Sequence, residues 1–351
     1  MRGTRSGRVT LDDVAGLAGV SRATASRVVR GHRGVNKSKE DAVRWAITEL
    51  GYIPDLSARA LASRRSNVIA MVAPSPGSTV VYDRAFARTV AAFVSSARAL
   101  SLEAIMVFDN LDHPQNDRFN YLFGGRVDAA VVLPHHGSSG QVEAMMNAPI
   151  PVVFIGQPPE PDEVAWVDMD DREAGALAAS YLCDHGATAP SLVTGPAGMT
   201  GSRNRMAGFL EAMAARGIRP RIIHSSIDED SGPRVSRRIA ALTRDGQIDG
   251  LFVASDVVAP GILGHLDALN VPIGPAGGGL PVAVVNDTEP VHDMPFECAV
   301  VNNPIERIAE CGANMVRWLM EGGNARGGQL VQIELTRFPG TNQDRTEREG
   351  V

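Results

Sequence analysis

The chain has 351 residues, of which 44% are hydrophobic and 21% are charged, and its formal net charge is −6 at pH 7. These values are ordinary for a soluble globular protein, and the length allows two or three domains. No apolar run reaches the roughly 18 residues that a membrane span requires, and the N-terminus lacks the apolar core of a signal peptide. The sequence therefore predicts a cytoplasmic protein with no membrane partner.

The charge is distributed unevenly along the chain. Residues 1–65 carry 13 Lys and Arg against 6 Asp and Glu, a net charge of +7, whereas the remaining residues have a net charge of −13. A basic N-terminal segment on an acidic body indicates that the segment meets a polyanion and that the body does not.

The N-terminal stretch contains the pattern of two short helices joined by a tight turn. In TLDDVAGLA, Thr10 is a good N-cap, and Asp13 stands three residues on, as in a capping box. Gly19 allows a positive φ in the turn, and Ser21 can cap a second helix. Two such helices form a helix-turn-helix, whose second helix fits the major groove of DNA. The outward face of this second helix carries Arg22, Ala23, Ser26, Arg27 and Arg30.

Two further helical segments follow. NKSKEDAVRWAITELG, residues 36–51, has an apolar stripe and ends at a glycine. YIPDLSARALASRR has Pro54 well placed for a first helical turn and apolar residues on one side, but it is too short to be stable alone. We expect this segment to form a helix only against a partner. A segment of this kind can act as a conformational switch.

From Asn67 onward, short β-branched runs alternate with helical segments. Strands are expected at VIAMVAP, EAIMVFD, DAAVVLP, PVVFIGQ, SLVTGP, GLFVASD and PVAVVND, and helices at residues 84–100 and 171–186. This alternation predicts parallel sheets with helices on both faces, and the number of strands favours two doubly wound subdomains. We expect a helix-turn-helix domain at 1–54, a hinge helix and linker at 55–66, and an α/β body at 67–345.

Ligands of such sheets bind beyond the carboxyl ends of the strands, where this chain has polar, charged and aromatic residues. Carboxylates, amides and arginine offer paired hydrogen bonds to hydroxyls, and aromatic rings stack on the C–H face of a sugar, so we expect a sugar or nucleoside. For Gln157, Asp168 and Arg203 a role at a strand end or helix cap is an equal alternative. The candidates are Tyr82, Asp83, Phe86, Gln157, Trp166, Asp168, Arg203, Arg205, Ser255, Asp256, Asn286, Asp287 and Glu289.

Several of these segments together resemble the LacI/GalR family of bacterial transcriptional regulators. They are VTLDDVAGLAGVSRATASRVVRG and GYIPDLSARALA near the N-terminus, and RVDAAVVLP, VDMDDREAGALAA, SRNRMAGF, VASD and VVNDTEP in the body. The resemblance covers Val9 to about Arg337. It implies an all-α helix-turn-helix DNA-binding head and a periplasmic-binding-protein-like α/β body of two doubly wound subdomains.

The resemblance also implies roles for individual residues of the head. Arg22, Ala23 and Arg27 match positions that read bases in the major groove. Leu61 matches the hinge leucine that wedges between base pairs in the minor groove and kinks the DNA. Arg30 replaces a common asparagine and adds charge. Positions that hold phosphates correspond to Ser21, Thr24, Ser26 and Tyr52.

In the body, the resemblance implies that Arg205 and Asp256 hold the hydroxyls of an effector. Asn286 stands where the family often has aspartate. The usual Asn-Pro-Phe-Phe after the first strand is absent, and only Phe86 fits it. The expected effector-binding residues are therefore Phe86, Gln157, Trp166, Arg205, Asp256 and Asn286.

These observations predict a sequence-specific repressor that binds double-stranded operator DNA as a homodimer and responds to a sugar-like effector. A sugar-processing enzyme with a DNA-binding head is disfavoured, because no phosphate loop, no G-x-G-x-x-G and no metal-ligand spacing occurs. His135 and His136 lack a third ligand, and Cys183, Cys298 and Cys311 fit reduced structural thiols. A transporter's solute-binding protein is disfavoured by the basic head. We expect neither a cofactor nor a metal.

Overall fold

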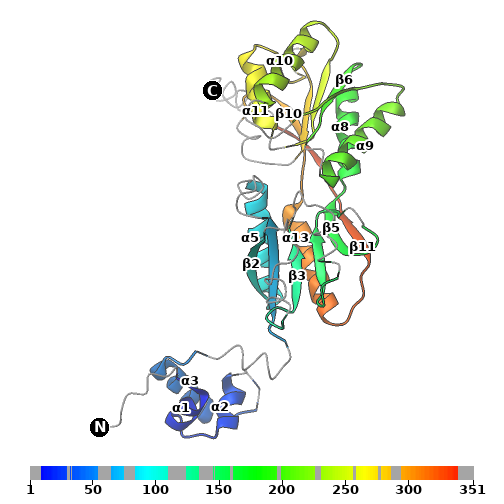
Figure 1. Cartoon of the computed structure of the whole chain (residues 1–351). Helices are drawn as coiled ribbons and strands as arrows, with labels where there is room; N and C mark the ends of the chain where they lie inside the picture. Colours follow the sequence, from blue (N-terminus) through cyan, green and yellow to red (C-terminus); the bar gives the residue numbers. More distant parts are fainter. Residues whose placement is uncertain are drawn as a thin grey trace, which may run out of the picture. The chain divides into compact units, whose positions relative to one another are not determined.

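The computed structural model describes residues 9–29, 32, 34–53, 65–74, 84–109, 124–133, 145, 147–158, 161–195, 199–225, 231–255, 258–275, 278–285 and 294–338. The chain divides into two compact units, Met1–Ser66 and Asn67–Val351 (Figure 1). Residues 55–64, most of the expected hinge segment, lie outside the described ranges.

The described part of the first unit contains α1 (Leu11–Leu17), α2 (Arg22–Val29) and α3 (Lys37–Leu50). The expected capping box at α1 is present: the Thr10 hydroxyl accepts from the backbone N–H of Asp13, whose carboxylate accepts from the Thr10 N–H at 2.9 Å. The φ of +59° at Gly51 ends α3. The helix-turn-helix prediction is confirmed, and the buried core of this unit is Val14, Ala15, Ala25, Val28, Val43 and Ala46.

The second unit contains two six-stranded sheets. In the first sheet the strand order is β11-β5-β4-β3-β1-β2, and every pairing is parallel. Its strands are β1 (Val68–Pro74), β2 (Glu103–Asp109), β3 (Ala129–Val132), β4 (Val152–Ile155), β5 (Ala165–Met169) and β11 (Gly327–Val331).

The second sheet has the order β12-β10-β9-β8-β6-β7 and is parallel except for β12, which runs antiparallel to β10. The prediction of two parallel-sheet subdomains is thus confirmed, with one antiparallel edge. Its strands are β6 (Pro190–Val193), β7 (Arg221–Ile223), β8 (Gly250–Val253), β9 (Val282–Val285), β10 (Cys298–Val301) and β12 (Leu335–Phe338).

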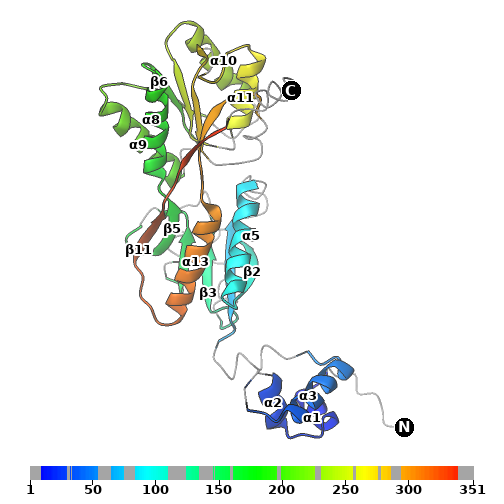
Figure 2. The ribbon, with the colours of Figure 1, turned by 180° about the vertical axis from the view of Figure 1, so that it is seen from behind.

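Helices cover both faces of the second sheet, as Figure 2 shows from behind. Along β8, Phe252 packs in the cluster that contains α8 (Asp171–Asp184) and α9 (Thr200–Ala214). Its neighbours Leu251 and Val253 pack in the cluster that contains α10 (Ser231–Arg244) and α11 (Ala259–Ala268). This alternation is the strand period of two, so each face of the sheet has its own helix pair.

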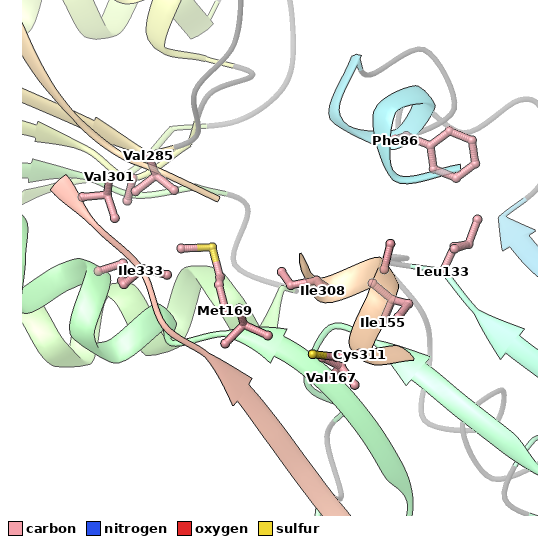
Figure 3. Packing of buried hydrophobic residues seen from close by; sticks show 14 of the residues in the cluster. Phe86, Leu133, Ile155, Val167, Met169, Val285, Val301, Ile308, Cys311 and Ile333 are labelled. Atoms are coloured by element: carbon pink, nitrogen blue, oxygen red, sulfur yellow. The ribbon is translucent and has the colours of Figure 1, made fainter. Parts of the chain in front are cut away.

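The chain passes between the two sheets three times, from β5 to α8, from β10 to α13 (Ile305–Met320) and from β11 to β12. On the first sheet, α13 packs against α5 (Arg84–Ala99). Figure 3 shows side chains near the crossings, with Met169 and Ile333 between Val301 and Ile308. These side chains belong to one buried cluster that contains residues of both sheets, so the two halves of the body share an apolar core.

Among the described residues, no helix is both long enough and apolar enough to span a bilayer.

Candidate functional site

The exposed face of α2 carries the residues expected to contact DNA bases. Ala25 and Val28 are buried against α1 and α3, which fixes the orientation of the helix. Arg22, Ala23 and Arg27 are exposed on the other side. The helix therefore presents two guanidinium groups and a small residue on one face, a pattern that suits the edges of bases in the major groove.

The start of α2 is held by hydroxyl groups. The backbone N–H of Thr24 donates to Ser21 Oγ at 3.2 Å, and the two hydroxyl oxygens are 2.9 Å apart. Arg22 Nε lies 3.4 Å from Asp12 Oδ1, and both side chains are largely exposed, so this pair is weak and Arg22 can reorient toward a ligand. Tyr52 packs against the core of the first unit.

Two of the predicted DNA-contacting residues cannot be placed. Arg30 and Leu61 lie outside the described residues, so their roles stay predictions. Ser26 is half-buried on α2, between the exposed and buried faces.

A group of polar side chains lies where β5 leaves the first sheet and α8 begins; we call Gln157, Asp168, Asp171, Asn204 and Arg205 the crossing cluster. The Asp168 carboxylate accepts from the backbone N–H groups of Gln157 and Met169, each at 2.8 Å. Asn204 Nδ2 donates to Gln157 Oε1 at 2.5 Å. Because Gln157 follows β4 and Asn204 lies on α9, this hydrogen bond joins the two halves of the body.

Arg205 is held by a shielded ion pair. Its Nε donates to Asp171 Oδ1 at 2.6 Å, and the side chains of Arg205 and Asp171 are 14% and 4% exposed. Its Nη1 donates to the carbonyl oxygen of Ala254, at the end of β8, at 2.9 Å. A Cβ at position 201 would lie 2.5 Å from Asp171 Oδ2, so Gly201 leaves room for the carboxylate.

The surroundings of Asp168 raise the pKa of its carboxyl group. Burial, followed by the negative charge of Asp171, raises the pKa of Asp168 from 3.8 to about 7. The hydrogen bonds from Gln157 and Met169 and the positive charge of Arg205 lower the pKa of Asp168 and oppose this shift. Near pH 7 this carboxyl group is therefore present in both its proton-donating and its proton-accepting form.

Two glycines fix the helices that carry this ion pair. A Cβ at Gly175 of α8 would overlap the backbone of Arg205 and Phe209 on α9, and a Cβ at Gly208 would overlap the backbone of Arg172. The two helices can approach this closely only without side chains at these positions. Asp171 and Arg205 are therefore positioned by backbone packing rather than by flexible side chains.

The remaining expected effector residues differ in their surroundings. Phe86, at the start of α5, is buried in the cluster that includes Leu133 (Figure 3). Trp166 packs in a separate buried cluster with Phe154, and its indole N–H donates to the carbonyl oxygen of Pro161 at 2.9 Å. Trp166 therefore has a packing role in this structure, and we leave it out of the crossing cluster.

Six further candidates lie outside the described residues: Tyr82, Asp83, Asp256, Asn286, Asp287 and Glu289. Arg203 is exposed on α9, where its Nη2 donates to Thr200 Oγ1 at 3.2 Å. Within the described ranges, no group of three or more His, Cys, Asp and Glu could hold a metal ion.

The sequence reasoning missed Asp171 and Asn204. Asp171 is an acidic residue in the first turn of a helix, a common place for one, and Asn204 has the spacing of an ordinary helical residue. The one available signal was their position beside residues already expected to bind the effector, Asp168 and Arg205.

Comparison with known proteins gives matches over both units. The lacI family of bacterial regulatory proteins matches residues 10–55, and the periplasmic binding protein domain matches residues 69–290. The HTH-type transcriptional regulator CelR of Thermobifida fusca is 30% identical over 342 residues, which cover 94% of this chain and 96% of the relative. Catabolite control protein A of Staphylococcus epidermidis is 25% identical over 339 residues, covering 95% and 99%.

Solved structures agree with these matches. A CelR–cellobiose complex has a TM-score of 0.68 at 26% identity and covers 95% of this chain and 100% of its own. The lac repressor dimer bound to operator and an anti-inducer has a TM-score of 0.78 at 22% identity, covering 95% and 99%, and shows the shared fold. These relatives are transcriptional regulators, not enzymes, and the chain belongs to the lacI family of bacterial regulatory proteins.

Proposed function

We propose that the protein is a sequence-specific repressor that binds operator DNA as a homodimer and is controlled by a sugar-like effector. The observation that carries the proposal is the crossing cluster, in which Arg205 and Asp171 lie where β5 passes between the two sheets. The CelR–cellobiose complex, 26% identical in sequence, supports a sugar as the effector class. We propose a cytoplasmic location, because a repressor of this kind works on the chromosome.

DNA recognition falls to α2. One helix reads only a few base pairs, and two-fold dimers read near-palindromic sites, so two copies of α2 are needed for a specific operator. The solved lac repressor dimer with its operator supports this stoichiometry.

Control by the effector acts through the contacts between the two halves of the body. A sugar hydroxyl that hydrogen-bonds to Arg205, Asp168 or Gln157 competes with or reinforces the Gln157–Asn204 hydrogen bond. Binding then favours one relative arrangement of the two sheets over another, which is a population shift. The two sites are coupled because the arrangement of the sheets sets the spacing of the two hinge segments and heads.

The test begins with an operator selected from a random-sequence DNA library, followed by a screen of neutral mono- and disaccharides that includes cellobiose. Operator affinity is then measured with and without each sugar for the wild type, for Arg205→Ala and for the control Arg203→Ala on the same helix. We expect at least one sugar to change the affinity of the wild type and of Arg203→Ala, and none to change that of Arg205→Ala. A normal response of Arg205→Ala contradicts the proposed effector site.

A further inference from the structure

We propose that Asp171 makes the effector site selective for uncharged sugars over sugar phosphates and other anionic ligands. The inference rests on the proposed function, because it takes Arg205 as part of the effector site. It narrows the ligand class from sugar-like molecules to uncharged sugars.

The first argument is that the charge of Arg205 is already neutralised. Arg205 Nε and Asp171 Oδ1 are 2.6 Å apart, and both side chains are well shielded from water. In such a place the Coulomb attraction of the pair is much stronger than at the surface. A phosphate that took the place of Asp171 at Arg205 Nε would leave the Asp171 carboxylate buried and unpaired, which is costly.

The second argument is that carboxylates occupy the N-terminus of α8. A helix N-terminus attracts anions through its free N–H groups and its dipole. Here Asp170 accepts from the backbone N–H of Glu173 at 2.9 Å, and Asp171 lies in the first turn. The positive end of this helix therefore has two anions of its own and offers little to a third.

The third argument concerns hydrogen-bond complementarity. The Asp168 carboxylate accepts hydrogen bonds from two backbone N–H groups, and a sugar hydroxyl can donate to it as well. A phosphate dianion presents only acceptor oxygens, so the negative charges of Asp168 and Asp171 repel it. Burial and Asp171 raise the pKa of Asp168 to about 7, so this group also donates in part of the population, again to a neutral hydroxyl oxygen.

Other arginines nearby have their own partners. Arg172 of α8 forms an ion pair with Glu211 of α9 at the exposed outer side of the helix pair. Arg203 is exposed and donates to Thr200. The pair Arg172–Glu211 therefore provides a matched control, because it joins the same two helices as Arg205–Asp171 but is exposed to solvent.

The experiment measures binding by calorimetry for glucose, maltose and cellobiose, each against its 6-phosphate. For the wild type we expect the best neutral sugar to bind at least about ten-fold more tightly than its phosphate, a difference of about 1.4 kcal/mol. In Asp171→Asn, Arg205 loses the carboxylate that its Nε contacts and the site loses one negative charge, so the ratio should fall about ten-fold or invert. Glu211→Gln should leave the ratio unchanged.

Melting curves show whether Asp171→Asn is folded. If it is not, Asp168→Asn replaces it, because this change removes a carboxylate and leaves the Arg205–Asp171 pair intact; the ratio should then fall about three-fold or more. A wild type that prefers the phosphate overturns the inference, and so does an unchanged ratio in the folded variant. If none of the sugars or phosphates binds, the proposed effector class fails, and the inference fails with it.

Discussion

At the scale of single residues, the exposed arginines of α2 allow a specific prediction about DNA recognition. Arg22→Ala and Arg27→Ala should each weaken binding to the selected operator by about 1–3 kcal/mol, because a bidentate contact to a base is lost. Binding to random duplex DNA should change far less, since the backbone contacts remain. Competition assays with operator and random DNA at one fixed salt concentration measure both losses.

The control for these variants is Arg44→Ala. Arg44 is exposed on α3, where its guanidinium donates to Glu40 at 2.7 Å, so it shares the residue type and the head but not the reading face. It should behave almost as the wild type on both DNAs. Equal losses on operator and random DNA for Arg22→Ala or Arg27→Ala would show that these side chains contact only phosphates.

The raised pKa of Asp168 predicts a pH-dependent stability. The folded-state pKa of Asp168 is about 7 and the unfolded value is 3.8, so between these values the folded state binds more protons. Stability from this group is therefore lost as the pH rises from about 4 to about 7, and it is constant above that. Asp168→Asn stays neutral, so its melting temperature relative to that of the wild type should be higher at pH 8 than at pH 4.

The matched control for this titration is Asp267→Asn, which changes an exposed carboxylate on α11. Its difference in melting temperature from the wild type should be the same at both pH values. If the difference between Asp168→Asn and the wild type is also independent of pH, Asp168 does not titrate near neutrality.

Some residues of the crossing cluster could be predicted from the sequence, and others could not. Gln157 and Asp168 could be expected near Arg205, because the carboxyl ends of parallel strands and the helices after them meet at one edge. Asp171 and Asn204 were missed because their place in the cluster depends on the close packing of α8 against α9. The pattern of apolar residues in the sequence does not reveal that packing. Trp166 was expected to face a ligand, but its ring is covered by apolar side chains of neighbouring strands.

At the scale of elements, the close packing of α8 and α9 predicts a large effect from a small change. Gly175→Ala should destabilise the body by about 1–3 kcal/mol or more, because the added methyl group meets the backbone of Arg205 and Phe209, which cannot rotate away. Chemical denaturation followed by circular dichroism measures the loss.

Gly261→Ala is the control for this change. Gly261 lies on α11, and a Cβ there meets no atom within 4 Å. Alanine also has the higher helix propensity, so this variant should be as stable as the wild type or slightly more stable. Similar losses in both variants would indicate that the helix pair can move apart and accept a side chain.

Burial alone does not decide which strands the sequence predicts. The bounds expected for β1 and β2 agree with the structure, because both are β-branched runs ended by Pro or Asp. Five strands were not predicted. β11 and β12 are edge strands with largely exposed side chains, and β7 is a three-residue strand at the other edge of the second sheet. β5 and β10 were also not predicted, although their side chains are largely buried. The antiparallel direction of β12 follows from its entry from the first sheet: β10 runs toward that sheet, and β12 runs away from it.

The segment at 55–66 carries a prediction that depends on the sequence alone. Leu61→Gly should remove the expected wedge and lower helix propensity by about 1 kcal/mol. Affinity for the operator should fall strongly, DNA bending should disappear, and the effector should lose most of its influence, because it acts through this segment. Gel mobility of circularly permuted operator fragments measures the bend. Unchanged bending, or an undiminished effector response, would contradict a hinge mechanism.

At the scale of the whole molecule, the uneven charge separates two tasks. Residues 1–65 carry a net charge of +7, and the remainder carries −13. The body therefore repels DNA and leaves the contact to the head, so that affinity falls with rising salt according to the phosphates the head contacts. Such a division lets a change in the body alter DNA binding without forming or breaking a direct contact with the duplex.

The same division implies that two copies must act together. A single head contacts too few base pairs for a specific site, so we expect a homodimer of twice the 37.2 kDa of one chain on a near-palindromic operator. Scrambling one half-site should remove most of the specific affinity, and inserting five base pairs between the half-sites should do the same, because it rotates one half by about half a helical turn. Inserting ten base pairs adds about one helical turn, so both half-sites again lie on the same face of the DNA but are farther apart. Binding should then recover only if the segment between head and body can extend. Light scattering and operator titrations measure these effects. A monomer in solution that binds one half-site as tightly as the full site would contradict the two-fold arrangement.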